Sequence, residues 1–349
     1  MHATTIGIDL AKDVFEIAIS AATGRVSARR RLSRRQFGAF VETLQPGTTV
    51  VMEACGTAHY WGRRCRARGA DVRLLPAQYV RPYVRRNKTD RADAEALLEA
   101  HRCGAMHAVP VKTVEQQTIQ AIHRVREQWQ RTRTARINIL RALLREQGVY
   151  FAVGAKTIHQ RITAVVADPE SPLPAMLRDA AWALLEDIRS LDGRLQAIDR
   201  QLTAVARVHP IAIRLQQIPG VGVITATALV ASVPHIHAFG RGRQFASWLG
   251  LTPRESSSGE RRTIGRMSKR GNPYLRTLLI HGARSALRVA QLRASQPGGS
   301  VTYLQRWAVA TAARRGPNRG AVALANKMAR IIWAMWTRER DFASPLETA

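Results

Sequence analysis

Cysteine is scarce in this chain: its 349 residues include only Cys55, Cys65 and Cys103. The number is odd, and no two of the three have the spacing of a zinc-binding motif. The sequence therefore indicates neither a disulfide framework nor a structural zinc site.

Long apolar runs are also lacking. No segment approaches the roughly 20 apolar residues that cross a bilayer as a helix, and the N-terminus runs directly into a polar-bounded strand pattern where a secreted protein would have a signal peptide. We therefore expect a soluble, cytoplasmic protein that acts at the nucleoid and has no membrane partner.

Acidic residues are few. The chain has 25 Asp and Glu against 54 Lys and Arg, a formal net charge of +29, and the excess is spread along its whole length. A body that is basic throughout indicates a polyanionic partner, because neutralising phosphates releases condensed counterions. The composition thus favours a nucleic-acid-binding protein.

The first part of the chain, residues 1–110, has the pattern of an α/β domain. Three apparent strands form a meander, with a tight turn at Lys12 and Asp13, and helices and strands then alternate. This order predicts a mixed sheet flanked by helices. The expected strands are 5–9, 14–20, 25–32, 49–53 and 71–75, and the expected helices are 35–45 and 58–68.

Residues 111–208 have the pattern of two coiled-coil helices, for which we expect a role in assembly. Spacings of four and three indicate a left-handed coiled-coil seam in the second helix. The pair could form an antiparallel hairpin within one chain or between subunits, or be ordinary bundle helices. The second seam comprises Leu177, Ala181, Leu184, Ile188, Leu191, Leu195, Ile198, Leu202 and Val205; a looser first seam comprises Ile122, Val125, Trp129, Thr132, Ile139 and Leu143.

Residues 209–349 are predicted to form a mainly helical domain with glycine-rich interruptions. The turn at 218–222 is similar to the hairpin of helix-hairpin-helix modules, in which Gly220 and Gly222 would let backbone N–H groups receive a phosphate. A plain helix–helix turn fits the same residues. Residues 250–271, rich in Ser, Gly, Arg and Lys, are expected to be a long loop that is functional or disordered.

Four acids are placed where they could work together; we call Asp9, Glu53, Asp90 and Asp93 the acidic quartet. Asp9 and Glu53 each end an apolar strand, where a carboxylate needs a partner. Asp90 and Asp93 share one face of a helix start. Oxygen ligands of this kind suit Mg²⁺, and a pair of ions could clamp the attacking and leaving oxygens of a phosphodiester. Singly, Asp90 could be an N-cap and Asp93 a first-turn charge.

Several long motifs occur in an order that resembles the DEDD transposases of insertion sequences, relatives of the pilin-gene invertase. The match is closest to a subgroup with a Glu-Ala/Val-Cys-Gly-Thr-Ala-His-Tyr-Trp motif. The resemblance implies an RNase H-like, RuvC-like N-terminal domain and a C-terminal transposase domain. The matching segments are 8–15, 52–61, 87–94, 218–222, 245–254, 258–259 and 267–272.

The resemblance also implies a mechanism. In this family the four acids bind Mg²⁺, for which Mn²⁺ can substitute, and a serine attacks DNA to form a transient phosphoserine link. Ser258 matches that serine best, while Ser256 and Ser257 leave the register open. The family also uses a structured, element-encoded bridge RNA that pairs with donor and target DNA, and its dimers assemble into tetramers that share the site between subunits.

Basic residues near the two candidate centres are expected to hold phosphates. Most would position the DNA backbone and take no part in the chemistry. They are Lys12, Lys88, Arg254, Arg261, Arg262, Arg266, Lys269, Arg270 and Arg276.

Other functions fit parts of the sequence. One is a resolvase-like, metal-dependent DNA endonuclease that uses water and needs neither the serine nor an RNA guide. Another is a nucleic-acid-binding structural protein without catalysis. The start at residues 7–10 is shared with actin-like sugar kinases, but a second glycine-rich phosphate loop is not evident, and the basicity fits that class poorly.

Overall fold

The computed structural model describes residues 4–21, 25–84, 90–104, 106–150, 162–168 and 170–343 of the chain. The chain divides into two compact units, Met1–Gln117 and Thr118–Ala349, and each has its own hydrophobic core. No helix within these described ranges combines the length and the apolar character that crossing a bilayer requires.

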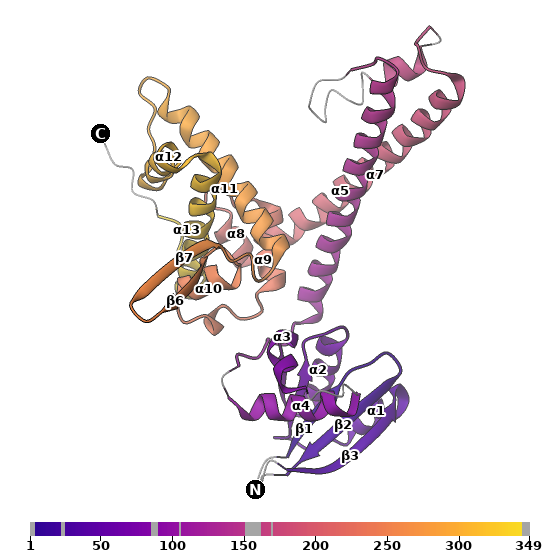
Figure 1. Cartoon of the computed structure of the whole chain (residues 1–349), viewed down its shortest axis with the longest axis vertical. Helices are drawn as coiled ribbons and strands as arrows, with labels where there is room; N and C mark the ends of the chain where they lie inside the picture. The colour runs from indigo at the N-terminus through magenta and orange to yellow at the C-terminus, as the bar shows by residue number, and fades with distance from the viewer. Residues whose placement is uncertain are drawn as a thin grey trace. The chain divides into compact units, whose positions relative to one another are not determined.

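A five-stranded mixed sheet forms the centre of the first unit (Figure 1). The strand order is β3-β2-β1-β4-β5. The first three strands pair antiparallel, whereas β1 pairs parallel to β4 and β4 to β5. This confirms the predicted mixed sheet. The strands are β1 (Thr5–Asp9), β2 (Val14–Ser20), β3 (Val26–Ser33), β4 (Thr49–Glu53) and β5 (Asp71–Leu75).

Helices cover both faces of this sheet, as predicted. On one face, α1 and α2 contribute Phe37 and Trp61, whose ring centroids lie 4.6 Å apart, to a core with Ile8 and Met52. On the other face, α4 packs through Leu97 and its neighbours. The helices are α1 (Arg34–Glu42), α2 (Ala58–Ala67), α3 (Ala77–Val80), the 3-10 helix η1 (Arg81–Tyr83) and α4 (Asp90–Arg102).

Two long helices, α5 (Val114–Glu146) and α7 (Ala175–Val208), lie side by side and antiparallel (Figure 1). Their ion pairs run in opposite chain directions, with Arg126 bound to Asp199 and Arg136 bound to Asp187. Of the predicted seam on α7, five residues are buried, and the seam packs against α5 of the same chain. The sequence had left a pairing within one chain or between subunits open, and the structure shows the former. The five are Ala181, Ile188, Leu191, Ile198 and Leu202.

The seam predicted for the first helix is wrong in register. Val125 and Ile139 are 42% and 48% exposed, whereas Ile137, Leu140 and Leu144 are buried. The arginine-rich α5 has apolar residues on more than one face, so periodicity alone did not identify the face that packs against α7.

A helical bundle completes the second unit, as predicted. α13 lies against α10, α11 and α12, and Met328 and Ile332 on α13 are fully buried. The elements are α8 (Pro210–Leu215), α9 (Val223–Ser232), η2 (Ile236–Ala238), α10 (Gly242–Trp248), β6 (Pro253–Ser258), β7 (Arg261–Met267), α11 (Pro273–Ala294), α12 (Tyr303–Arg315) and α13 (Pro317–Arg338).

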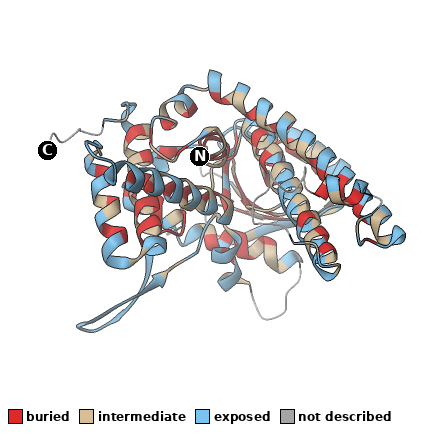
Figure 2. Cartoon of the chain, turned by 90° about the horizontal axis from the view of Figure 1, so that it is seen from above, coloured by how far each residue is buried: buried red, intermediate tan, exposed pale blue. Residues whose placement is uncertain are grey.

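The segment 250–271 is a β-hairpin, which corrects the expectation of a long loop. β6 and β7 pair antiparallel, and nearly all their residues are exposed, so Figure 2 shows both strands in pale blue. A strand is recognised in a sequence by one apolar face that alternates with a polar one. This hairpin has no buried face, and the sequence therefore lacked that signal.

A buried polar network joins α5 to the bundle. Thr227 Oγ1 donates to the Val223 carbonyl at 2.8 Å, so it accepts from His123 Nε2, which lies 3.0 Å away. His123 Nδ1 is then left to accept from the Tyr274 hydroxyl, also at 3.0 Å. The imidazole is thus held neutral, with one tautomer selected by its two partners.

Candidate active site and nucleic-acid interface

Two carboxylates of the acidic quartet end neighbouring parallel strands. Ile8 of β1 is paired with Met52 of β4, so the next residues, Asp9 and Glu53, lie at the same edge of the sheet. Side chains alternate along a strand, and Ile8 and Met52 face the core under α1 and α2. Asp9 and Glu53 therefore project on the opposite face, which α4 covers.

Helix α4 brings Asp93 to that face. A Cβ atom added to Gly7 would lie 2.4 Å from the Ala94 carbonyl oxygen, so the helix backbone approaches β1 as closely as a glycine permits. Asp93 is next to Ala94 and half-buried, and its Oδ1 is buried without a hydrogen-bond partner. Asp90 begins α4 one turn earlier, but its side chain lies outside the described part of the structure.

The pKa of the Cys55 thiol indicates that Asp9 and Glu53 both lie near this sulfur atom. Burial raises the pKa of Cys55, and the negative charges of Glu53 and Asp9 raise it further. Both carboxylates thus act electrostatically on one sulfur atom, two residues beyond the end of β4. The thiol stays protonated at neutral pH.

These acids have the chemistry of a divalent-cation site. Hard cations take carboxylate oxygens, and a buried Asp93 Oδ1 without a partner is costly unless something binds it. Among the described residues, which exclude the Asp90 side chain, no three carboxylate, thiol or imidazole groups are already gathered closely enough to hold an ion. Whether the quartet can surround a divalent cation therefore depends on where the Asp90 side chain lies.

Sequence reasoning missed a fifth acid at this edge. Glu16 of β2 is paired with Asp9 in the antiparallel register, which puts the two side chains on the same face. Glu16 Oε1 lies 3.4 Å from Arg31 Nε, and its side chain is 16% exposed. The alternation of β2 around Phe15 and Ile17 was the signal that could have found it.

The other predicted residues of the first unit have simpler surroundings. The Lys12 side chain is exposed in the turn after β1, and its carbonyl accepts from Arg34 Nε at 3.0 Å. Lys88 lies outside the described residues. His59 Nδ1 accepts from the Lys112 backbone N–H at 3.2 Å. Burial, with the charges of Lys112 and Arg63, lowers the pKa of His59 to about 4, so this histidine is a neutral packing group.

Ser258 is at the tip of the β6–β7 hairpin. It pairs with Arg261, and Gly259, at φ 54°, is the first of two turn residues, as a type II′ turn prefers. Ser257 lies on the other face of the hairpin, where its hydroxyl donates to Glu255 Oε1 at 3.3 Å. Arg262 Nε donates to the same oxygen at 2.8 Å.

The three candidate serines are thereby separated into two groups. Ser256 and Ser258 share a face with Arg261, because side chains alternate along β6 and opposed residues point the same way. Ser257 shares its face with the paired Glu255 and Arg262 and is bonded to the carboxylate. All three serines are exposed.

The base of the hairpin is held by close backbone contacts. A Cβ atom on Gly250 or on Gly271 would lie 1.9 Å from the carbonyl oxygen of Arg270 or Trp248, respectively. Arg276 Nη1 donates to the Leu249 carbonyl at 3.3 Å. The hairpin therefore projects an exposed tip from a fixed base.

The predicted phosphate contacts on this hairpin differ in their surroundings. Arg276 has a structural role at the base, and Arg254 Nη2 donates to the Ser268 carbonyl at 3.4 Å. Lys269 has a left-handed backbone at φ 55°, which is strained for a residue with a side chain. The side chains of Arg261, Arg266, Lys269 and Arg270 are exposed.

The turn between α8 and α9 packs on α11 through glycine. Gly220 has φ 91°, and a Cβ atom there would lie 2.4 Å from the Gly282 carbonyl oxygen. Gly222 is exposed at the N-cap of α9, which has no side-chain cap. Phosphate binding by the first N–H groups of α9 stays a prediction of the sequence.

Comparison with known proteins shows similarity across both units. A family profile described as "Transposase", for the DEDD transposases of IS110 type, matches residues 6–148. A second, described as "Transposase IS116/IS110/IS902 family", matches residues 212–296.

Individual relatives are similar over nearly their full length. A Pseudomonas aeruginosa protein named "Probable family 20 transposase" is 42% identical over 97% of this chain and 98% of its own. The transposase for insertion sequence element IS1111A of Coxiella burnetii is 41% identical over 97% of this chain and 90% of its own. The transposase for IS1328 of Yersinia enterocolitica is 35% identical over 98% and 99%.

Proposed function

The chain belongs to the IS116/IS110/IS902 family of insertion-sequence transposases, and on this premise we propose that it cuts and rejoins DNA through Ser258 and an Mg²⁺ centre in the acidic quartet. A transposase is an enzyme that acts on DNA, and a DEDD domain implies dependence on divalent metal ions. The proposal adds the nucleophile, the ion and the residues that hold it.

The surroundings of Asp93 support the metal centre most directly. Its Oδ1 is buried without a hydrogen-bond partner, on the sheet face to which Asp9 and Glu53 also project. Bound Mg²⁺ would stabilise negative charge on the phosphoryl oxygens. Asp9 and Glu53 end neighbouring parallel strands, so their carboxylates lie at the same edge of the sheet.

The hairpin supports Ser258 as the nucleophile. Its hydroxyl is exposed at the tip and shares a face with Arg261, which suits a group that must reach a phosphodiester. In the proposed step the Ser258 oxygen bonds to phosphorus, the bond from phosphorus to the leaving strand breaks, and the hydroxyl proton is passed on to the leaving oxygen or to solvent. Attack by another strand's hydroxyl then reverses the step and releases Ser258.

We further propose that an element-encoded bridge RNA guides the enzyme to donor and target DNA, and that dimers assemble into a tetramer. The net charge of +29 supports more than one nucleic-acid partner. The α7 seam packs on α5 within the chain, so assembly would use other surfaces. RNA of one defined length, copurified at high salt and sequenced, tests the guide; RNA of random length contradicts it.

A strand-exchange assay on supercoiled donor and target plasmids tests the nucleophile. We expect Ser258→Ala to abolish joining and the covalent protein–DNA adduct on a denaturing gel, and Ser257→Ala to retain both. Strand exchange by Ser258→Ala would overturn the covalent mechanism. Nicking without joining by that variant would instead favour the endonuclease that uses water.

Thermal unfolding tests the metal centre without relying on activity. We expect MgCl₂ or MnCl₂ to raise the Tm of the wild-type chain and of Asp13→Asn, an exposed control in the turn after β1, because an ion that binds the folded state stabilises it. Asp93→Asn should remove this rise. Without metal it should be no less stable, since a neutral amide replaces a half-buried carboxylate whose Oδ1 is buried without a hydrogen-bond partner.

A further inference from the structure

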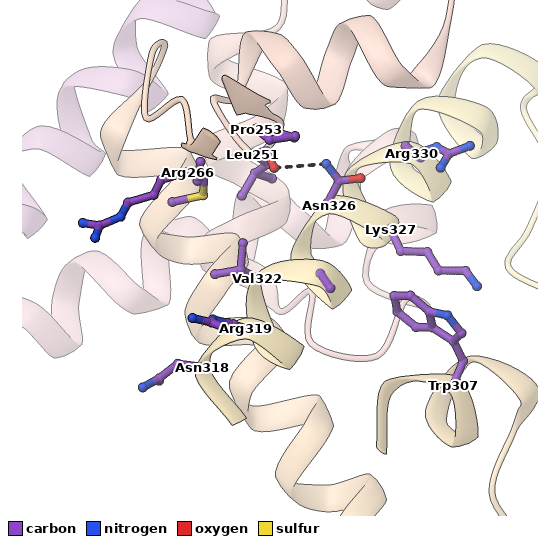
Figure 3. A pocket seen from close by; sticks show the side chains of 12 residues that line it. Leu251, Pro253, Arg266, Trp307, Asn318, Arg319, Val322, Asn326, Lys327 and Arg330 are labelled. Carbon is purple, nitrogen blue, oxygen red and sulfur yellow. Dashed lines mark hydrogen bonds between the residues drawn. The ribbon is translucent and has the colours of Figure 1, made fainter. Parts of the chain in front are cut away.

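A cationic groove lies beside the base of the β6–β7 hairpin (Figure 3). Its volume is about 970 Å³. Leu251, Pro253, Arg266 and Met267 line it from the hairpin side, and residues of α12 and α13 line the rest. Asn326 Nδ2 donates to the Leu251 carbonyl at 3.1 Å and so ties α13 to the hairpin base.

All the charged side chains that line this groove are positive. The lining includes the cations Arg266, Arg319, Lys327 and Arg330 and no acidic residue. The surrounding sequence has the same bias: between Glu260 and Glu339 there is no Asp or Glu, and there are 16 Lys and Arg. Such a surface attracts a polyanion, and the cations have no acid of their own nearby in the sequence to neutralise them.

Aromatic rings stand among these charges. Lys327 Nζ lies 4.4 Å from the centroid of the Trp307 ring and 5.1 Å from that of Tyr303. Trp307 is only partly buried and lines the groove, and Tyr303 is 51% exposed. Cations along a groove with one ring among them and a second ring beside Lys327 have the composition of a surface that follows a phosphate backbone and stacks unpaired bases.

We propose that this groove binds a short segment of single-stranded nucleic acid, with its phosphates on Arg319, Lys327 and Arg330 and a base stacked on Trp307. The volume is near the upper end of pockets for small ligands, about 300–1,000 Å³, which suits a few nucleotides. This inference rests on the proposed function and deepens it. Strand exchange produces single-stranded DNA, and a guide RNA must have unpaired segments to pair with DNA.

The groove would hold that strand near the candidate nucleophile. Arg266 lines the groove and lies on β7 five residues from Arg261, the partner of Ser258. At about 3.4 Å per residue of a strand, this is roughly 17 Å along the hairpin. The hairpin base would thus anchor a strand whose continuation can reach the tip.

Fluorescence anisotropy with 12-nucleotide single-stranded DNA, single-stranded RNA and duplex DNA of the same sequence tests the proposal on the full chain. We expect Lys327→Gln to weaken binding of at least one single strand and to reduce the slope of log K against log salt by about 0.7, the loss of one phosphate contact. Arg288→Gln removes an exposed charge on α11 and is the matched control. It should weaken the binding of single-stranded DNA and of single-stranded RNA less than Lys327→Gln does.

Trp307→Ala should weaken single-strand binding about 10- to 100-fold, and Trp307→Phe should restore most of it. Because Trp307 also packs on the core, each variant's Tm is measured alongside. A 5-iodouracil-containing strand should photocrosslink to the tryptic peptide that contains Trp307. Loss restricted to DNA or to RNA would identify which strand occupies the groove, and either supports the proposal.

Equal weakening by Lys327→Gln and Arg288→Gln, or an equal loss of duplex binding, would overturn the groove proposal. This outcome is separable from failure of the catalytic proposal. If Ser258→Ala still exchanges strands while Lys327→Gln binds single strands more weakly, the covalent mechanism is contradicted and the groove proposal is supported. If Ser258→Ala loses strand exchange while Lys327→Gln binds single strands normally, only the groove proposal is contradicted.

Discussion

Gly7 shows how a residue without a side chain can set the distance between the candidate metal-binding acids. It has no side chain between β1 and α4, and the Ala94 carbonyl occupies the space where a Cβ would be, at 2.4 Å. Asp93 is adjacent to Ala94, so the distance between the helix acid and the strand-end acids depends on this contact.

We therefore expect Gly7→Ala to push α4 away from β1, because the obstructing atom belongs to the backbone and cannot rotate aside. The free energy of unfolding in urea should fall by about 1–3 kcal/mol, and the rise in Tm on adding Mg²⁺ should shrink. Gly38→Ala on α1 is the control, since its added Cβ would meet only the Arg64 side chain at 3.5 Å. Equal stability of Gly7→Ala and wild type would show that this contact does not position α4.

His123 makes stability depend on pH. Burial, with the positive charge of Arg126, lowers its pKa to about 4, against about 6.5 in an unfolded chain. Between these values the unfolded chain binds more protons, so the free energy of unfolding should decrease as pH falls from about 6.5 to 4. His59 adds to the same window.

His123→Gln should flatten this dependence by removing one of the histidines whose pKa is lowered in the folded chain, and the exposed His237→Gln should not. Urea denaturation at several pH values measures the slope. An unchanged slope in His123→Gln would mean that the histidine titrates alike in the folded and unfolded chain.

The helix pair α5 and α7 shows how an element acquires its partner. Apolar burial along the α7 seam provides the attraction, and the ion pairs align the two helices antiparallel. Arg126 is 17% exposed and binds Asp199, which is 45% exposed, with 2.6 Å between Nε and Oδ1. Partly exposed pairs of this kind contribute modestly to stability.

Exchanging the charges of this pair tests the alignment. Arg126→Glu and Asp199→Arg should each lower the free energy of unfolding, and the double variant should recover part of the loss. The coupling energy should be about 0.2–1 kcal/mol. Strictly additive losses in a urea-based double-mutant cycle would mean that the two charges do not interact in solution.

The hairpin is an element that the rest of the second unit must support. A two-stranded hairpin exposed on both faces is at best marginally stable in water. Here the contacts of Gly250 and Gly271 and the hydrogen bonds of Arg276 fix its base, while the tip with Ser258 has no protein cover.

For the whole molecule, the two candidate centres belong to different units. The acidic quartet is in the first and Ser258 is in the second. Each unit is compact by itself, so a variant that disables one centre can leave the other intact.

Mixing such variants tests whether subunits share a site. Asp93→Asn and Ser258→Ala should each fail to exchange strands alone, and a mixture incubated to allow subunit exchange should recover a fraction of wild-type activity. The double variant mixed with wild type is the control for dilution. If the mixture stays inactive although mass photometry shows mixed oligomers, the quartet and the serine must come from the same chain.

The sequence alone predicted the features that depend on local patterns. A three-strand meander followed by alternating helices and strands was sufficient to predict the mixed sheet, and Asp9 and Glu53 were singled out because each ends an apolar strand. The α7 seam was predicted for the same reason: heptad spacing is a local property of one helix. The order of the long motifs indicated the family.

Only the tertiary structure decided which surfaces meet. It placed Glu16 opposite Asp9, because register is a property of two strands. It selected the buried face of α5, since several of its faces contain apolar residues. It made 250–271 a hairpin, because that hairpin is stabilised by its anchored base and not by an apolar face of its own. The cationic groove combines residues that are up to about 80 positions apart in the chain, and such a juxtaposition arises only when the helices pack.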